Sequence, residues 1–136
     1  MTKRTRNTRA ERRGATAVEF ALTAPVFLLF LMAAFEFGWL NVVRHTADNA
    51  AYEAARSAVV PGASVAEATA KADTLLRVVG ARGATVTVSP NPVTVSADKV
   101  TVNIRIPMDQ NGLIVPRFTG KTTIEAETTF RTERPE

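Results

Sequence analysis

Few side chains of this 136-residue chain have the types and spacing needed for chemistry. His45 is the one histidine, and a metal site would need further ligands around it. The absence of cysteine excludes disulfides and thiolate metal sites, and the segment from Gly80 to Gly83 lacks the lysine of a phosphate-binding loop. We predict no catalytic residue, no metal and no cofactor. Two carboxylates in apolar settings remain, Glu19 and Glu36.

Glu19 stands at the junction of a cationic segment and a long uncharged one. The first 14 residues carry a net charge of +5, whereas residues 15–136 sum to −1. Residues 20–35 contain no charge at all. The basic residues of the first segment are Lys3, Arg4, Arg6, Arg9, Arg12 and Arg13. Because basic segments beside apolar helices stay on the cytoplasmic side of a membrane, the pattern predicts a cytoplasmic N-terminus.

The uncharged run alone is short for a membrane span. Its 16 residues would rise about 24 Å as a helix, less than the roughly 30 Å of the hydrocarbon core. The apolar pattern resumes after Glu36, and an extension to Val43 would rise about 36 Å, enough to cross with some tilt. We therefore predict a transmembrane helix over 15–43, with Pro25 accommodated inside it and Trp39 at the far interface. A secretory signal peptide is disfavoured because the helical pattern continues beyond the run.

The residues around Glu19 resemble the type IV prepilin cleavage motif, in which a membrane aspartic peptidase cuts after a glycine. They read Arg13-Gly14-Ala15-Thr16-Ala17-Val18-Glu19-Phe20. The resemblance implies cleavage between Gly14 and Ala15, where a residue without a Cβ lets a peptidase approach the backbone. Cleavage would create an α-ammonium group on Ala15. A Glu19 buried among apolar helices needs a counter-ion, and the expected partner is the free amine of an adjacent subunit.

A longer stretch is similar to the TadE-like family, pilin-like proteins of the tight-adherence (Tad, Flp-type) pilus system. The similar residues are 14–22, Pro25, 35–38 and the alanine-rich continuation 47–56. The resemblance implies a minor pilin or pilus-assembly component of the bacterial inner membrane, linked to adhesion and without enzymatic activity. Its implied partners are a prepilin peptidase, other pilins, the inner-membrane assembly platform and membrane lipid.

Three side chains are assigned to subunit assembly, namely Glu19, Phe20 and Glu36. For Glu36 two interpretations stay open. It marks a helix–helix contact in an assembly, or it only reaches the membrane interface.

Residues 36–60 are predicted to continue the first helix, with small apolar residues at helical spacing. These residues are Val43, Ala47, Ala50 or Ala51, Ala54 and Ala58. The stripe fits packing against the chain's own sheet or against another subunit. Pro61 ends the helix, and Ser64 and Glu67 fit the capping box of a second helix that runs to about Val79.

From residue 84 the hydrophobic period changes to two, which predicts strands over 84–89, 99–106 and 122–131 with one face buried. A short strand over 93–96 also fits. The apolar residues 113–115 fit either covering the sheet edge or docking a partner, and we favour edge covering. The fold class is therefore α+β, pilin-like, with a small antiparallel sheet. The predicted parts are a basic leader (1–14), a transmembrane helix (15–43), a helix continuation (44–60) and an extracytoplasmic α+β domain (61–136).

Two other functions fit parts of the pattern. An uncut single-pass membrane protein with an extracytoplasmic binding module would keep the topology and have no role in a pilus. A nucleic-acid-binding protein would use the basic leader to neutralise phosphates, but it would have to be soluble. Since the leader adjoins an apolar helix, we predict no nucleic-acid partner.

Overall fold

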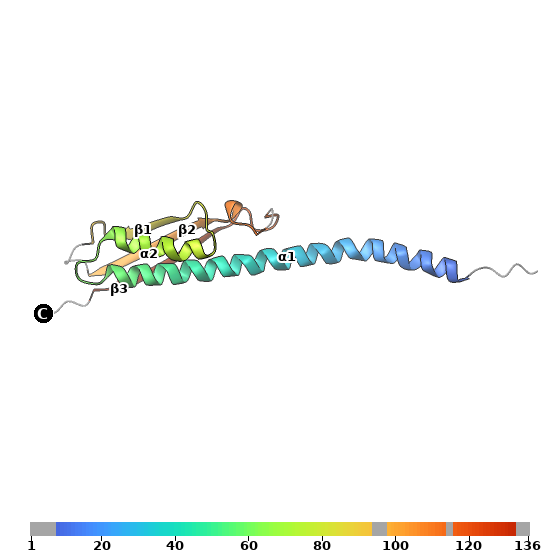
Figure 1. Cartoon of the computed structure of the whole chain (residues 1–136), viewed down its shortest axis with the longest axis horizontal. Coiled ribbons are helices and arrows are strands. Elements are labelled where there is room, and N and C mark those ends of the chain that lie inside the picture. The colour runs from blue at the N-terminus through green and yellow to red at the C-terminus, as the bar shows by residue number, and fades with distance from the viewer. Residues whose placement is uncertain (1–7, 94–97, 114–115, 133–136) are drawn as a thin grey trace, which may run out of the picture. The chain divides into compact units, whose positions relative to one another are not determined.

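The computed structural model describes residues 8–93, 98–113 and 116–132, with side chains from residue 14 onward. A long apolar helix, a second helix and an antiparallel sheet follow one another along the chain (Figure 1). The elements are α1 (Thr8–Ala58), α2 (Val65–Val78), β1 (Thr85–Ser89), β2 (Lys99–Pro107), the 3-10 turn η1 (Met108–Gln110) and β3 (Thr123–Arg131). The predicted α+β fold class is confirmed.

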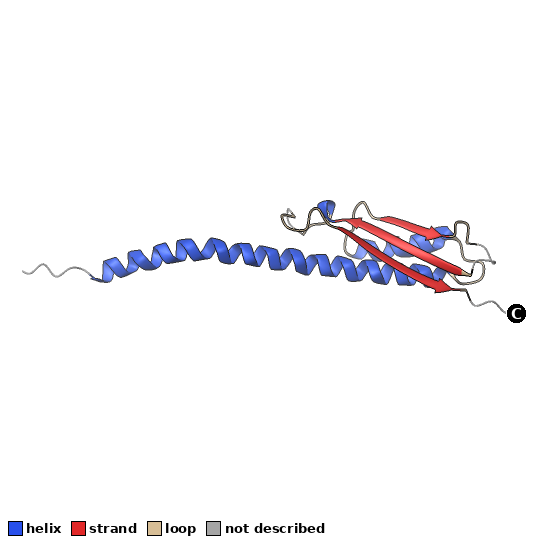
Figure 2. Ribbon diagram, turned by 180° about the vertical axis from the view of Figure 1, so that it is seen from behind, coloured by secondary structure: helices blue, strands red, loops and turns tan. Residues whose placement is uncertain are grey.

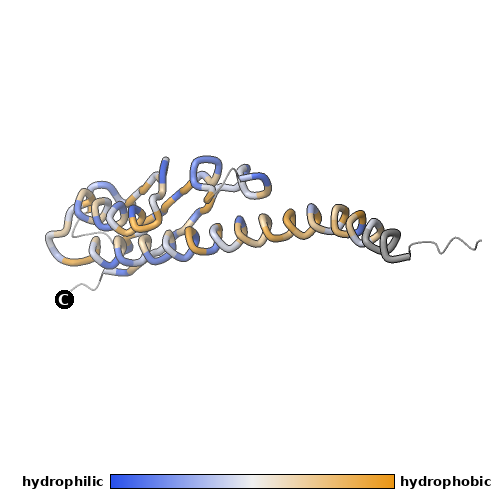
Figure 3. Tube along the Cα trace, turned by 45° about the vertical axis from the view of Figure 1, so that its right-hand side comes forward, coloured by the Kyte–Doolittle hydropathy of each residue, from blue (hydrophilic) through white to orange (hydrophobic). Residues whose placement is uncertain are grey.

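The chain divides into two compact units, Met1–Phe35 and Glu36–Glu136. In the described part of the first unit, α1 is apolar and exposes its large side chains, with Phe20 70 % exposed and Phe30 73 % exposed. Figure 3 shows this part of α1 mostly in the colour of apolar residues. Helix α1 continues through Pro25, and it is long and apolar enough to cross a membrane. Surfaces this apolar require lipid or other helices around them.

In the second unit, the C-terminal half of α1 and all of α2 cover one face of the sheet (Figures 1 and 2). The small residues predicted on α1 are buried in this core: Val43, Ala47, Ala50, Ala51, Ala54 and Ala58. Alanine side chains let the helix backbone approach the strands closely, which keeps the interior densely packed. The alanine stripe therefore packs against the chain's own sheet, one of the two interpretations that its spacing allowed.

The strands are antiparallel in the order β1-β2-β3, and β2 is central. Ile104 lies opposite Val86 on β1 and Ala126 on β3, so this layer of the core draws on all three strands. The buried residues of β2 alternate with exposed or half-buried polar ones, as the period of two predicts. On the polar face, Arg105 Nε lies 3.1 Å from Glu125 Oε1, an exposed pair that contributes little to stability.

The start of α2 has the predicted capping box. Glu67 N donates to Ser64 Oγ (3.2 Å), and Ser64 N donates to Glu67 Oε2 (3.0 Å). This reciprocal pair satisfies two backbone donors that the first turn leaves free. Gly80 follows the helix with a φ of 61°, the left-handed conformation that glycine adopts without strain and that ends many helices.

Two predictions on loops lie largely outside the described residues. Of the predicted short strand, Val93 packs against the core without belonging to a strand, and residues 94–96 are not described. Of the apolar loop residues, Leu113 is 56 % exposed, and Ile114 and Val115 are not described, so their predicted role stays a prediction.

Candidate functional site

The predicted cleavage site lies on the exposed surface of α1. Gly14 and Ala15 are both exposed and helical. A Cβ built on Gly14 would meet no atom within 4 Å, so the fold itself does not require a glycine there. Within a helix, glycine costs about 0.5–1 kcal/mol relative to alanine. Gly14 therefore makes local unwinding of α1 easier at the bond that the motif marks for cleavage.

Glu19 is exposed on the same helix, and Phe20 follows it. Thr23 Oγ1 donates to the backbone carbonyl of Glu19 (2.9 Å) rather than to its carboxylate. In the described part of the chain, the Glu19 carboxylate has no hydrogen-bonded or ionic partner. The cleavage role of Gly14 and the assembly roles of Glu19 and Phe20 stay predictions, because a single chain does not test them.

Glu36 has a different environment, since it is only 5 % exposed and its carboxylate is surrounded by donors from one loop. Arg117 N donates to Oε1 (2.9 Å), and Phe118 N donates to Oε2 (2.9 Å). Thr119 adds its backbone N–H (3.2 Å) and its hydroxyl (3.4 Å), both to Oε2. We call these four bonds the Glu36 contact. It ties the connection between η1 and β3 to the first residue of the second unit.

The Glu36 contact is a small anion-binding nest of successive backbone N–H groups, filled by the chain's own carboxylate. The backbone N–H of Arg117 lowers the pKa of Glu36 most, and the donors of Phe118 and Thr119 lower it further, while burial acts in the opposite direction. The carboxylate is therefore held in its charged form. Its predicted role between subunits stays untested, and within the chain it positions a loop.

One helical turn further along α1, Trp39 holds the same connection. Its Nε1 donates to the backbone carbonyl of Asn111 (2.7 Å). The buried Asn111 side chain accepts from Arg82 N (2.6 Å) and donates to Arg82 O (2.7 Å) and Pro107 O (2.6 Å). Trp39, predicted at the membrane interface, is thus half-buried in the folded unit. Asn111 joins α1, the segment after α2 and the end of β2.

We expect Asn111→Ala to destabilise the second unit, because it leaves partly buried backbone groups of Arg82 and Pro107 without their partners. Each buried group left unsatisfied costs about 1–3 kcal/mol. Asn111→Asp should be worse still, since its carboxylate would face the carbonyls of Arg82 and Pro107. Thermal unfolding of the two variants beside Asp109→Asn, an exposed position in the same connection, checks this. Equal melting temperatures for all three variants would contradict it.

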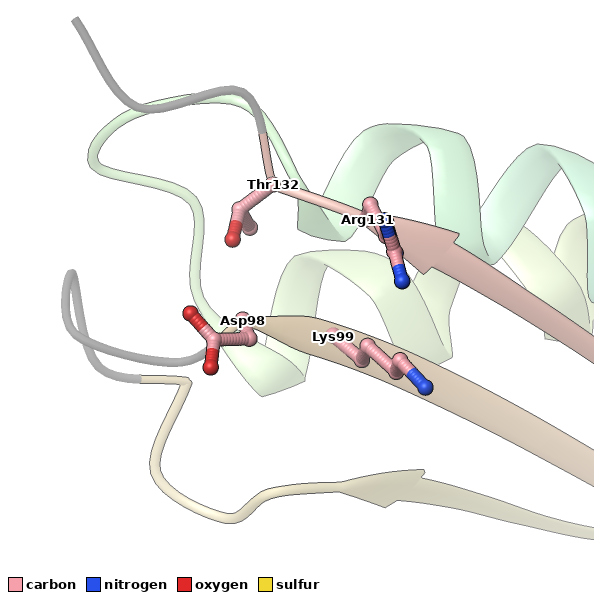
Figure 4. A pocket seen from close by; sticks show the side chains of 4 residues that line it. All are labelled: Asp98, Lys99, Arg131 and Thr132. Atoms are coloured by element: carbon pink, nitrogen blue, oxygen red, sulfur yellow. The ribbon is translucent and has the colours of Figure 1, made fainter.

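Other groups with possible chemistry are His45 and four residues at the end of the sheet. His45 is exposed, and no group of three or more His, Asp or Glu side chains is placed to hold a metal ion among the residues described. At the end of the sheet, Asp98, Lys99, Arg131 and Thr132 line a shallow hollow (Figure 4). Lys99 and Arg131 are direct cross-strand partners, and Thr132 N donates to the carbonyl of Asp98 (3.2 Å).

The sequence alone did not predict the partners of Glu36 and Trp39. Both side chains bind a connection more than 70 residues further along the chain, which carries no helical or strand periodicity. The sequence offered one signal: the Glu36 carboxylate and the Trp39 indole N–H stand among apolar residues of the helix. Polar groups of this kind need hydrogen-bond partners wherever they are buried.

Comparison with known proteins adds one match. A protein-family model of TadE-like proteins matches residues 14–56. The matched segment begins at Gly14 and includes Glu19, Phe20 and Glu36. A search of curated proteins and a search of solved structures found no match. Over residues 14–56 the chain is therefore similar to TadE-like proteins.

Proposed function

We propose that this chain is a minor pilin-like component of Tad pilus biogenesis. It is made as a membrane-anchored precursor, cut after Gly14 by a prepilin peptidase, and assembled into the pilus or into the complex that initiates it. The observation that supports this most is an exposed apolar helix that bears a carboxylate five residues after Gly14, inside the TadE-like segment.

Cleavage would convert the N-terminal part of the chain from an anchor into an assembly element. It removes a leader with six cations, which would otherwise hold the N-terminus in the cytoplasm. The remaining apolar helix can then leave lipid for a bundle of similar helices. In such a bundle an unpaired Glu19 would cost several kcal/mol, so a neighbouring α-ammonium group is the partner that makes its burial tolerable.

We propose a single-pass topology with a cytoplasmic leader (1–14) and an extracytoplasmic folded unit. The Glu36 contact supports a membrane span over 15–35 rather than the 15–43 predicted from hydropathy. Irregular backbone such as 117–119 is not tolerated where it faces hydrocarbon, so a residue that binds it lies outside that layer. The 21 residues of 15–35 rise about 31 Å, which matches the hydrocarbon core.

Loss of the Glu19 charge is the test of assembly. We expect Glu19→Ala to be inserted and processed normally and then to be missing from sheared pili, because its uncharged helix no longer pairs with a neighbour's amine. Immunoblots of membrane and pilus fractions measure this, with Asp109→Ala as an exposed carboxylate control in the folded unit. If Glu19→Ala enters pili as well as the unmodified chain does, the assembly role proposed for Glu19 fails.

A further inference from the structure

We propose that Asn111 and Gly112 form a site of spontaneous deamidation that the folded unit keeps closed. In this reaction the backbone nitrogen of Gly112 attacks the side-chain carbonyl of Asn111. Water is the co-reactant, and the product is aspartate or isoaspartate at position 111. Local opening around Asn111 therefore becomes irreversible once it lasts long enough for this step. The reaction needs neither a membrane nor a pilus.

The first support is the sequence around Asn111. This residue precedes Gly112, whereas every other asparagine of the chain precedes a residue with a Cβ. Glycine leaves its nitrogen unshielded and its backbone free to turn, so an asparagine before glycine cyclises more readily than one before a larger residue. The chemistry is intrinsic to the unfolded chain, and the fold decides whether it proceeds.

The reaction conserves atoms and oxidises nothing. A bond forms between the nitrogen of Gly112 and Cγ of Asn111, and the bond between Cγ and Nδ2 breaks. The proton lost by Gly112 leaves with Nδ2 as ammonia. Water then opens the five-membered imide at either of its carbonyls. One opening gives aspartate, and the other gives isoaspartate, in which the main chain passes through Cβ.

The second support is backbone geometry. Asn111 has a φ of −122° and a ψ of 17°, and its N–H donates to the carbonyl of Met108 (3.2 Å). The imide closes only when Cβ and the next nitrogen eclipse each other, at a ψ of about −120°, which lies outside the main allowed regions. The observed ψ holds the nitrogen of Gly112 away from Cγ. Trp39 Nε1 also binds the Asn111 carbonyl (2.7 Å), so rotation of this peptide group must break that bond.

The third support is the hold on the leaving group. Nδ2 of Asn111 donates to the carbonyls of Arg82 (2.7 Å) and Pro107 (2.6 Å), and Oδ1 accepts from Arg82 N (2.6 Å). Rotation of Cγ toward Gly112 would break these bonds, and Asn111 is only 8 % exposed to water. A carboxylate at this position has no hydrogens to donate to the two carbonyls. The converted chain therefore does not regain the native contacts.

Peptide mapping by mass spectrometry measures conversion at each asparagine. The full-length chain is incubated at mildly alkaline pH, folded in detergent micelles and unfolded in urea. Asn49, exposed on α1, and Asn103, on β2, are internal controls. Gly112→Ala is measured in urea, where no fold is required, and tests the need for glycine. Trp39→Phe is measured in micelles and tests the hold on the backbone.

We expect Asn111 to convert faster than both control asparagines in urea, and Gly112→Ala to remove this excess. In micelles the conversion of Asn111 should be slower by roughly tenfold or more, since it then requires local opening. Trp39→Phe should raise the rate in micelles by up to about tenfold, the factor that loss of one hydrogen bond allows. Converted molecules, separated by their added negative charge, should melt at a lower temperature.

Equal conversion of Asn111 in micelles and in urea would overturn the proposal, because the fold would then give no protection. A rate in urea no higher than that of Asn49 would also overturn it, because the site would not be reactive. An unchanged rate in Trp39→Phe would contradict the hold through the backbone carbonyl. Equal melting of converted and unconverted molecules would contradict irreversibility.

Discussion

Replacing Gly14 by alanine is expected to leave the uncut precursor in the membrane. The added methyl meets no atom within 4 Å, so the folded chain accepts it. It stands, however, at the bond where we propose that the peptidase cuts, and it stabilises the helix there by about 0.5–1 kcal/mol against unwinding. Both effects oppose cleavage. The intact mass of detergent-extracted protein measures the result, which should include residues 1–14 in most molecules.

Gly38 offers the matched control for this prediction. It is the other described glycine of α1, and its Cβ would also meet nothing within 4 Å. Gly38→Ala should therefore stabilise the helix by a similar amount and leave processing unchanged. Normal maturation of Gly14→Ala would mean that the peptidase does not read this glycine. It would favour the alternative of an uncut single-pass membrane protein with an extracytoplasmic binding module.

Removal of the Glu36 carboxylate is expected to release the connection between η1 and β3. In Glu36→Ala, the backbone N–H groups of Arg117, Phe118 and Thr119 lose their acceptor. Their amide hydrogens should exchange roughly tenfold faster or more, since local opening no longer breaks charged hydrogen bonds. Glu36→Gln should give a smaller effect because it keeps one acceptor oxygen. Glu53→Ala, a half-buried acid on α1 without a bonded partner among the described residues, is the control.

The same contact predicts how stability depends on pH. The loop donors lower the pKa of Glu36 in the folded protein relative to the unfolded chain. Its contribution to stability is therefore complete above the unfolded-state pKa and is lost as the pH falls through the lowered folded-state pKa. Acid titration of the melting temperature should show this loss in the unmodified chain and a reduced loss in Glu36→Gln. Identical acid dependence in both would show that Glu36 is not held as proposed.

The elements whose signal is periodic could be predicted from the sequence. The uncharged run predicted an apolar helix, the Ser64–Glu67 pair predicted a helix start, and the alternation around Ile104 predicted the central strand. Each of these signals lies within a few residues of the element that it predicts. The spacing of the alanines on α1 predicted a close contact but not its partner, because a sheet and a neighbouring helix both favour small residues.

The long-range polar contacts could not be predicted in the same way. Trp39 has an apolar body and one donor, which suits a membrane interface as well as the Asn111 carbonyl that it binds. The Glu36 carboxylate likewise finds possible partners at a lipid headgroup, on a neighbouring subunit or in a loop of its own chain. The sequence shows that such groups need partners, and only the fold brings residues 36 and 117–119 together. This contact also moves the proposed end of the membrane span from Val43 to Phe35.

The N-terminal residue of the mature protein tests the central claim most directly. Protein extracted from membranes of cells that contain the prepilin peptidase should begin at Ala15, and protein from cells without that peptidase should begin at Met1. A chain that begins at Met1 in both would contradict processing after Gly14 and, with it, the pairing of Glu19 with a neighbour's new amine.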